Sequence, residues 1–444
     1  MIRGRRSARA LSTDVALLGL LCAFKLGIDA CVLHVGFSHV SDDDYARTVI
    51  AEQFAYAPRL DPSATSWLPL PFWIVGGAMR VLGRSLEAAR IVAIAIGALG
   101  VVPPYVAMRA ARVSRATALA ATLVAMSLPW NAWLGAATVP DGWTAGLIAA
   151  AAIAMHRDGA RPWCAVALLA ASLARYEAWA ACAILAIVSG IRAARSGERR
   201  IVWREVGCAL VALAGPALWM AWNAHAHGSA FHFMARVSAF RRTIGAADVP
   251  FRDKLLGYPR AFLSDTPEAA ALGACGMAGL WASAQIRSRW SGAAIVALAV
   301  LAFLVAGDLG DGAPTHHPAR ALIAVVWVCV GMGIDATARA IASRRAQASR
   351  WVSGLAAASI AVLWVDSLPA RWTMAPGEGD SDRRDPQIAR GLELRRREAG
   401  SADVTPCQFE HFALIAAWGA PERVHVNART GGAITTACPQ VNVR

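Results

Sequence analysis

The chain has 444 residues, of which 57% are hydrophobic and 17% are charged, and its mean hydropathy is +0.43. Soluble domains carry more charge and fewer apolar residues, so the composition excludes an ordinary soluble protein. In a soluble protein, a net charge of +14 would suggest a nucleic-acid partner. We expect no nucleic-acid partner here, because the basic residues follow a membrane pattern.

Apolar runs approach the ~20 residues that cross a bilayer as a helix, and they recur along the whole chain. Runs of this length predict helices and not barrel strands. The first run follows a basic N-terminus. It shows no clear cleavage site and is interrupted by Lys25 and Asp29, so we predict a retained span and not a signal peptide. The eleven predicted spans are 14–36, 89–109, 116–134, 140–156, 162–174, 177–192, 203–224, 269–286, 291–307, 319–338 and 350–369.

The distribution of arginine predicts the orientation of these spans. Short loops on one side hold Arg175, with Arg320 just inside the tenth span. Because basic residues mark the cytoplasmic side, we predict a bacterial inner-membrane protein with a cytoplasmic N-terminus and a periplasmic C-terminus. The arginine-rich segments are the N-terminus and the loops at 109–115, 157–161, 192–204, 287–289 and 339–350.

Three long segments fall on the outer side of this topology. Residues 37–88 and 225–268 form outer loops, and residues 370–444 follow the last span. We therefore predict a transmembrane domain at 1–370 and a small periplasmic domain at 371–444. A protein that places its non-membrane residues outside is expected to work there.

The first outer loop opens with three adjacent carboxylates, Asp42, Asp43 and Asp44, followed by Tyr45. With Ser41 as N-cap, acids in the first turn predict a helix at 41–56. The acids either cap and solubilise this helix or do chemistry. Adjacent carboxylates repel one another, so a shifted carboxylate or a divalent cation such as Mg²⁺ or Mn²⁺, bound by Asp42 and Asp44, is the alternative.

A proline- and tryptophan-rich stretch around Trp67 follows in the same loop. Proline breaks helices and tryptophan suits the headgroup region of a membrane. The run at 70–82 is too short to span comfortably, so we predict a second interfacial helix. The simpler interpretation of this stretch is an interfacial re-entry without chemistry.

Polar residues also mark the outer ends of later spans. Asp141 begins the fourth span, where it is either a helix N-cap or a site residue. Arg175, Tyr176 and Glu177 form a tight hairpin. Arg175 is either paired with Glu177 and the acidic loop or binds a lipid phosphate, since guanidinium matches phosphate geometry.

Two other polar groups are less specific. Asp308, Asp311, His316, His317 and Arg320 crowd the loop before the tenth span, and adjacent histidines alone are weak evidence for metal. The lysine and aspartate inside the first span are four residues apart, a spacing that favours mutual pairing over a proton path.

The C-terminal segment is polar and charged. Residues 403–405 and 423–426 are strand-like, and residues 410–418 are helix-like, which predicts a small α/β appendage. In an oxidising compartment, Cys407 and Cys438 are the natural disulfide pair. The chain has no phosphate-cradling glycine loop, nucleophile elbow, HExxH or Cys-x-x-Cys motif, so soluble nucleotide chemistry is unsupported.

Taken in order over residues 1–330, these motifs resemble the GT-C superfamily of membrane glycosyltransferases. The resemblance is to the family of dolichyl-phosphate-mannose–protein mannosyltransferases and bacterial aminoarabinose transferases. The matching positions are Asp42-Asp43-Asp44-Tyr45, Trp67-Leu68-Pro69-Leu70, Arg90, Asp141, Arg175-Tyr176-Glu177 and His317 to Arg320.

The resemblance implies an all-α polytopic fold with interfacial helices and a polyprenyl-phosphate-linked sugar as donor, used at the outer face. Asp43 is expected to be the general base, with Asp42 or Asp44 orienting it or holding a cation. The implied donor-phosphate ligands are Arg175, Arg320 and Arg90. The implied substrate contacts are Tyr45, Trp67, Asp141, Tyr176, Glu177 and His317.

The implied partners are membrane lipid and an acceptor, which the sequence leaves open among lipid, protein and polysaccharide. Two other classes of function remain. A transporter or flippase of a lipid-linked or polar solute would place functional charges at mid-membrane depth and show inverted repeats. A non-catalytic envelope assembly protein would depend on the C-terminal appendage and not on Asp43.

Overall fold

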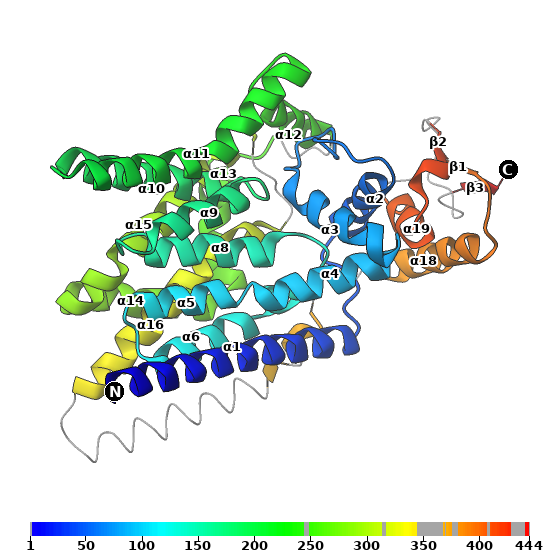
Figure 1. The fold of residues 1–444 in the computed structure, drawn as a ribbon. Coiled ribbons are helices and arrows are strands. Elements are labelled where there is room, and N and C mark those ends of the chain that lie inside the picture. The colour runs from blue at the N-terminus through cyan, green and yellow to red at the C-terminus, as the bar shows by residue number, and fades with distance from the viewer. Residues whose placement is uncertain are drawn as a thin grey trace.

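The computed structural model shows a bundle of helices with a smaller group of helices and strands at one end (Figure 1). We call this end the outer end, after the topology that the sequence predicts. The residues that the structure describes are 2–243, 248–312, 317–343, 367–368, 370–374, 381–405, 409–427 and 440–443.

Long apolar segments form the bundle. Six helices in the described part of the chain are long and apolar enough to cross a membrane, so the prediction of a multi-pass helical membrane protein is confirmed. The bundle elements are α1 (Ile2–His34), α4 (Leu86–Leu99), α5 (Val102–Ala110), α6 (Arg115–Ser127), α7 (Pro129–Ala136), α8 (Asp141–Ala154), α9 (Arg161–Ser172), α10 (Glu177–Arg195), α11 (Arg199–His227), α14 (Pro267–Ala282), α15 (Ala284–Leu309), η1 (Pro318–Leu322) and α16 (Ile323–Ser343).

Several predicted span boundaries differ from the observed helices. The second predicted span is divided into α4 and α5, because Pro103 and Pro104 lie in the first turn of α5. The third is divided where Pro129 begins α7. The turn between α14 and α15 lies at Ser283, which caps α15 through Ile286 N. The last predicted span lies almost wholly outside the described residues, so the count of eleven stays a prediction.

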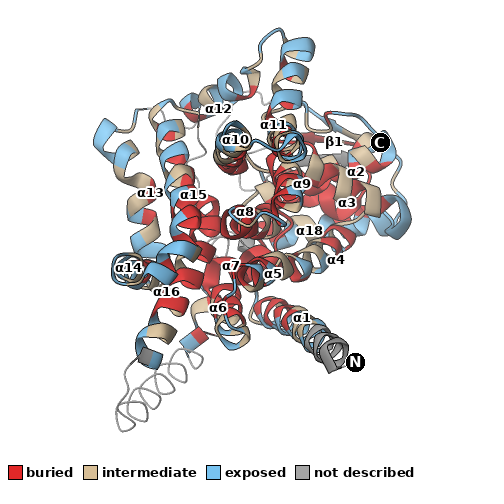
Figure 2. Cartoon of the chain, turned by 60° about the vertical axis from the view of Figure 1, so that its left-hand side comes forward, coloured by how far each residue is buried: buried red, intermediate tan, exposed pale blue. Residues whose placement is uncertain are grey.

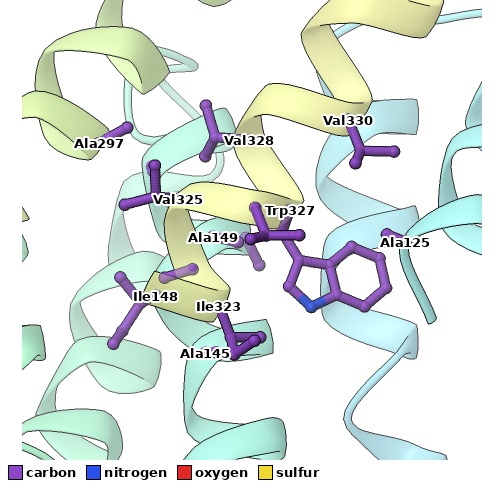
Figure 3. Close-up of a cluster of buried hydrophobic side chains, with 14 of the residues drawn as sticks. Ala125, Ala145, Ile148, Ala149, Ala297, Ile323, Val325, Trp327, Val328 and Val330 are labelled. Carbon is purple, nitrogen blue, oxygen red and sulfur yellow. The ribbon is translucent and has the colours of Figure 1, made fainter. Parts of the chain in front are cut away.

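Small residues allow the helices to pack closely. Figure 3 shows Ala145, Ile148 and Ala149 beside side chains of α16, with Ala297 and Ala125 on neighbouring helices. Alanine and glycine let helix backbones approach, which drives helix association in lipid. Burial is concentrated at the centre of the bundle, around α7 and α8, whereas α1, α13 and α14 lie at its periphery (Figure 2).

The outer loops contain four further helices. The first loop forms α2 (Asp43–Tyr56) and α3 (Leu70–Leu82), which confirms both predicted helices of that loop. The 225–268 loop forms α12 (His232–Thr243) and α13 (Phe251–Asp265). Arg241 pairs with Asp308 at 2.6 Å, and Lys254 pairs with Asp311 at 2.7 Å. The two aspartates before the tenth span therefore fasten this loop to the bundle.

The C-terminal appendage contains both helices and strands. It comprises α18 (Ser381–Arg396), β1 (Ala402–Thr405), α19 (His411–Trp418), η3 (Pro421–Arg423), β2 (Val424–Val426) and β3 (Gln440–Val443). The strand order is β2-β1-β3. β1 pairs parallel to β2, with Ala402 opposite Val424, and antiparallel to β3, with Ala402 opposite Val443. Cys407 and Cys438 lie outside the described residues, so their pairing stays a prediction.

The appendage does not stand apart from the first outer loop. Tyr45 and Val49 of α2 belong to the same buried apolar cluster as Leu394, Leu414 and Trp418 of the appendage. The boundary predicted at residue 371 separates two parts of the sequence, but one apolar core joins them.

Candidate active site

The three adjacent carboxylates of the first outer loop face three different environments. Asp44 is buried. Its Oδ1 accepts a hydrogen bond from Thr138 N at 2.8 Å, and its Oδ2 accepts from Val40 N at 3.1 Å and Ser41 N at 3.3 Å. Asp44 therefore ties the start of α2 to the bundle. Its oxygens are engaged by backbone donors in this structure, and its expected roles as a catalytic residue and as a metal ligand stay predictions.

Asp42 points to the C-terminal appendage. Arg384 Nε donates to Asp42 Oδ1 at 2.7 Å, and Arg384 Nη2 donates to Oδ2 at 2.8 Å. This bidentate pair occupies both oxygens. Asp42 and Asp44 thus face different partners in this structure, and the cation site predicted between them stays a prediction. Among the described residues, no group of three or more His, Cys, Asp or Glu side chains is placed to hold a metal.

Asp43 is the accessible member of the triplet. Its side chain is 41% exposed, and its Oδ2 lies 3.3 Å from Arg320 Nη1. Arg320 Nη1 also donates to Ser41 Oγ at 3.2 Å, so Ser41 does not act as the side-chain N-cap that the sequence predicted. Asp43 is therefore both oriented by a guanidinium and open to an incoming group.

Behind Asp43 lies a buried network of alternating charges. Arg320 contacts both oxygens of Asp141 at 3.3 Å, and Arg175 Nη1 lies 3.3 Å from Asp141 Oδ1. Arg175 Nε in turn donates to Glu177 at 3.1 Å. Burial acts to lower the pKa of Arg175, but Asp141 and Glu177 more than offset it and raise the pKa. Residues far apart in the sequence thus meet at one end of the bundle.

This network commits the predicted phosphate ligands to partners within the protein. Arg175 and Arg320 each face carboxylates, and Arg90 donates to the carbonyl of Ser38 in the loop before α2. Their charge contributes to the field of the site, but their hydrogen-bonding groups are largely used. Arg90 does not join the cluster around Asp141.

Arg47 is a site residue that the sequence motifs did not predict. This residue lies one helical turn after Asp43 and is 6% exposed, and its Nε and Nη1 have no hydrogen-bond partner within the described structure. Its guanidinium lies 4.5 Å from the ring centroid of Trp67. Burial lowers its pKa to about 10, although Asp43 and Asp141 act to raise it. The i,i+4 spacing from Asp43 was the available signal, because it puts both residues on one helix face.

Arg47 borders a small cavity at the junction of α2, α3 and the loop before α8. The cavity has a volume of about 10 Å³, roughly the room for one water molecule. Its lining residues are Arg47, Thr48, Ala51, Pro71, Phe72, Val75 and Thr138. Burying a cation without hydrogen-bond partners is costly, so the two unsatisfied nitrogens make Arg47 a candidate for contact with a group outside the chain.

The predicted aromatic contacts serve packing. Tyr45 is fully buried, and its hydroxyl lies 3.2 Å from His39 Nδ1. Tyr176 donates to Ser66 O at 2.7 Å and accepts from Trp219 Nε1 at 3.0 Å. Burial raises the pKa of both phenols. Both hydroxyls are engaged inside the protein, and the predicted substrate contacts of Tyr45 and Tyr176 stay predictions.

The two remaining predicted contacts are less enclosed. Trp67 is half-buried and forms one wall of the Arg47 environment. His317 has a left-handed backbone, with φ of 53°, and its ring centroid lies 5.7 Å from that of Trp130.

The two charged residues inside α1 pair with each other. Lys25 Nζ lies 2.8 Å from Asp29 Oδ1 and donates to Asn131 O at 2.9 Å. Both side chains are buried. The pair neutralises itself against α7, so the feature that suggested a transporter is accounted for by helix packing.

No protein-family model matches the sequence, and no curated protein matches it significantly. Among solved structures, ArnT from Cupriavidus metallidurans bound to undecaprenyl phosphate is similar, with 15% identity over 93% of this chain and 75% of that one, and a TM-score of 0.46. The Archaeoglobus fulgidus oligosaccharyltransferase complex with Zn and sulfate shows 14% identity over 85% and 55%, with a TM-score of 0.49.

A further structure of the Archaeoglobus fulgidus oligosaccharyltransferase AglB, with an inhibitory peptide and a dolichol-phosphate, has a TM-score of 0.45. It shows 13% identity over 87% of this chain and 59% of that one. All of these proteins have the GT-C fold, the class that the sequence motifs resemble. At such identities the likeness concerns the fold alone, and it assigns no residue role or activity to this chain.

Proposed function

We propose that the protein is an integral membrane glycosyltransferase that moves a sugar from a polyprenyl-phosphate donor to an acceptor hydroxyl at the outer end of the bundle. The proposal rests on two neighbouring groups: Asp43 is an accessible carboxylate, and Arg47 is a buried guanidinium whose Nε and Nη1 have no hydrogen-bond partner in the described structure. One group is free to take a proton, and the other is free to meet an anion.

The proposed reaction begins at Asp43. The acceptor hydroxyl transfers its proton to the Asp43 carboxylate while its oxygen bonds to the anomeric carbon of the donor sugar. The bond between that carbon and the phosphate oxygen breaks, and its electron pair leaves with the polyprenyl phosphate. General base catalysis of this kind contributes about 10²–10⁴-fold.

The charges of the site suit this reaction. Its three guanidiniums, Arg47, Arg175 and Arg320, face three carboxylates, Asp43, Asp141 and Glu177. When Asp43 takes a proton, the group gains one positive charge overall. At the same moment the phosphate changes from a diester to a monoester and gains one negative charge. The site thus becomes complementary to the leaving group as bond breaking proceeds, which is where electrostatic stabilisation accelerates a reaction.

The proposal limits the class of sugar donor to polyprenyl-phosphate-linked sugars, but it does not identify the acceptor. The ArnT structure contains undecaprenyl phosphate, and the AglB structure contains a dolichol-phosphate. Undecaprenyl phosphate and dolichol-phosphate are therefore the first carrier lipids to test. No step is assigned to a metal ion, because Asp42 and Asp44 are bound to other groups.

A transfer assay in detergent tests the proposal. Purified protein is mixed with radiolabelled polyprenyl-phosphate sugars and membrane lipid extract, and Asp43→Asn is compared with wild type. We expect a loss of about 10²–10⁴-fold in Asp43→Asn. Asp253→Asn, an exposed carboxylate of α13, is the matched control and should remain active. Full activity in Asp43→Asn would show that Asp43 is not the general base.

A further inference from the structure

The C-terminal appendage supplies a charged side chain to the catalytic loop. Arg384 of α18 is 4% exposed at its side chain and forms the bidentate pair with Asp42, which is 22% exposed. The third nitrogen, Nη1, lies 3.3 Å from Glu410 Oε1 beside α19. One guanidinium therefore lies between a carboxylate of the appendage and the residue that precedes the proposed base.

A second ion pair holds the same two parts together away from the acidic triplet. Arg84, in the turn between α3 and α4, donates to both oxygens of Glu422 at 2.6 and 2.9 Å. Close packing adds to this contact, because a side-chain carbon at Gly419 would lie 2.5 Å from Arg84 O. The appendage thus has a defined seat on the outer helices that does not depend on Arg384.

The first turn of α2 is held from three directions. Asp42 is bound by the appendage, Asp43 by Arg320 of the bundle, and Asp44 by the backbone around Thr138. The three carboxylates are consecutive, so a rotation of the turn that suits one partner displaces the others. Without Arg384, Asp42 would be a second anion next to Asp43 and could compete with it for Arg320.

We propose that Arg384 is a positioning residue: by binding Asp42, the appendage keeps that carboxylate away from Arg320 and fixes the orientation in which Asp43 accepts a proton. This inference rests on the proposed glycosyl transfer. It assigns the C-terminal appendage to the active site and not to a separate binding module. Arg384 acts through Asp42.

The test compares Arg384→Gln with Arg84→Gln in the full-length protein. Displacement of a catalytic group by about 1 Å costs on the order of 10²-fold, so we expect kcat to fall about 10²-fold in Arg384→Gln, with little change in the KM for the donor. Arg84→Gln breaks the other ion pair and should stay within about fivefold of wild type. Arg384→Lys keeps the charge but not the bidentate geometry, so it should recover part of the activity.

A double-substitution cycle shows whether Arg384 acts through Asp42. We expect Asp42→Asn combined with Arg384→Gln to be no worse than Arg384→Gln alone, because both changes remove the same contact. Additive losses, or equal losses in Arg384→Gln and Arg84→Gln, would mean that Arg384 merely helps to seat the appendage, and the proposal would be overturned.

Hydrogen–deuterium exchange without substrate separates this inference from the proposed function. Arg384→Gln should speed exchange of residues 41–48 while Arg84→Gln does not. If it does so in a protein that transfers no sugar, Arg384 does orient the acidic turn, but the glycosyltransferase assignment fails and the catalytic positioning role fails with it. If wild type transfers sugar and Arg384→Gln changes neither exchange nor kcat, the positioning role alone fails.

Discussion

The two ends of the helix bundle both bury arginine beside carboxylates, but they leave the charges in different states. At the end opposite the site, Arg161 is fully buried. It lies 2.8 Å from Glu205 and 2.8 Å from Asp158, and its Nη1 donates to Met155 O at 3.5 Å. At the outer end, Arg47 is also buried but lacks partners at Nε and Nη1.

The difference shows how to distinguish a structural charge from a functional one in this protein. A buried guanidinium whose nitrogens are all engaged stabilises the packing of the helices that carry its partners. A buried guanidinium with free donors carries an uncompensated desolvation cost, which makes Arg47 a candidate for ligand contact. Three substitutions can break or sharpen this comparison.

The largest expected effect is a loss of stability from a substitution at Arg161, at the end of the bundle opposite the site. Arg161→Gln leaves Glu205 buried with Arg204 as its remaining ionic partner, and loss of one member of a buried pair costs about 3–5 kcal/mol. Thermal unfolding in detergent should show this loss, while sugar transfer per folded molecule stays at the wild-type level. Arg192→Gln, which removes an exposed contact to Asp158, should cost at most about 1 kcal/mol. A stable Arg161→Gln protein with impaired transfer would contradict the comparison.

Arg47→Gln should have the opposite effect: sugar transfer is lost and stability is retained. Loss of a donor that stabilises developing charge costs about 10²–10³-fold in kcat, so transfer should fall by that factor. The unfolding temperature should stay the same or rise, because the substitution removes a buried charge whose Nε and Nη1 have no hydrogen-bond partner in the described structure. If the protein unfolds as readily as Arg161→Gln does, Arg47 belongs with the structural arginines.

The smallest expected effect concerns a buried carboxylate instead of a buried arginine. Glu52 of α2 is fully buried, and its two oxygens have no hydrogen-bond partner within the described structure. Burial raises its pKa well above the ordinary value of 4.5. An acid with a raised pKa in the folded state destabilises the fold as pH rises above the pKa of the unfolded chain.

Glu52→Gln should therefore raise the unfolding temperature at pH 8 and change it little at pH 4.5. Glu87→Gln, in the first turn of α4, is a control for general charge effects. An equal shift at both pH values would show that Glu52 is not neutral in the folded protein.

Local patterns predicted the helices well. The bounds of α3 were obtained because Pro71 and Gly83 mark its ends, and α19 ends at Gly419, whose φ is +76°. The placement of Asp141 and Arg175 at the same end as the acidic loop followed from topology alone. These features depend on short stretches of sequence or on the alternation of spans, both of which can be read directly.

The partners of the site residues could not be predicted in the same way. Arg384 lies 342 residues from Asp42, and nothing in either stretch identifies the other. Arg47 resembles a solvated residue of an interfacial helix, and its burial depends on α3 and on Thr138. The helix α18 was not among the elements predicted within the polar C-terminal segment.

The shared core of α2 and the appendage has a consequence for how the protein matures. Synthesis proceeds from the N-terminus, so α2 is made long before Leu414 and Trp418 exist to cover Tyr45 and Val49. The bundle can be inserted while this face of α2 is still bare. The first outer loop is therefore completed last, and a ribosome that stops before the appendage leaves Tyr45 and Val49 without their cover.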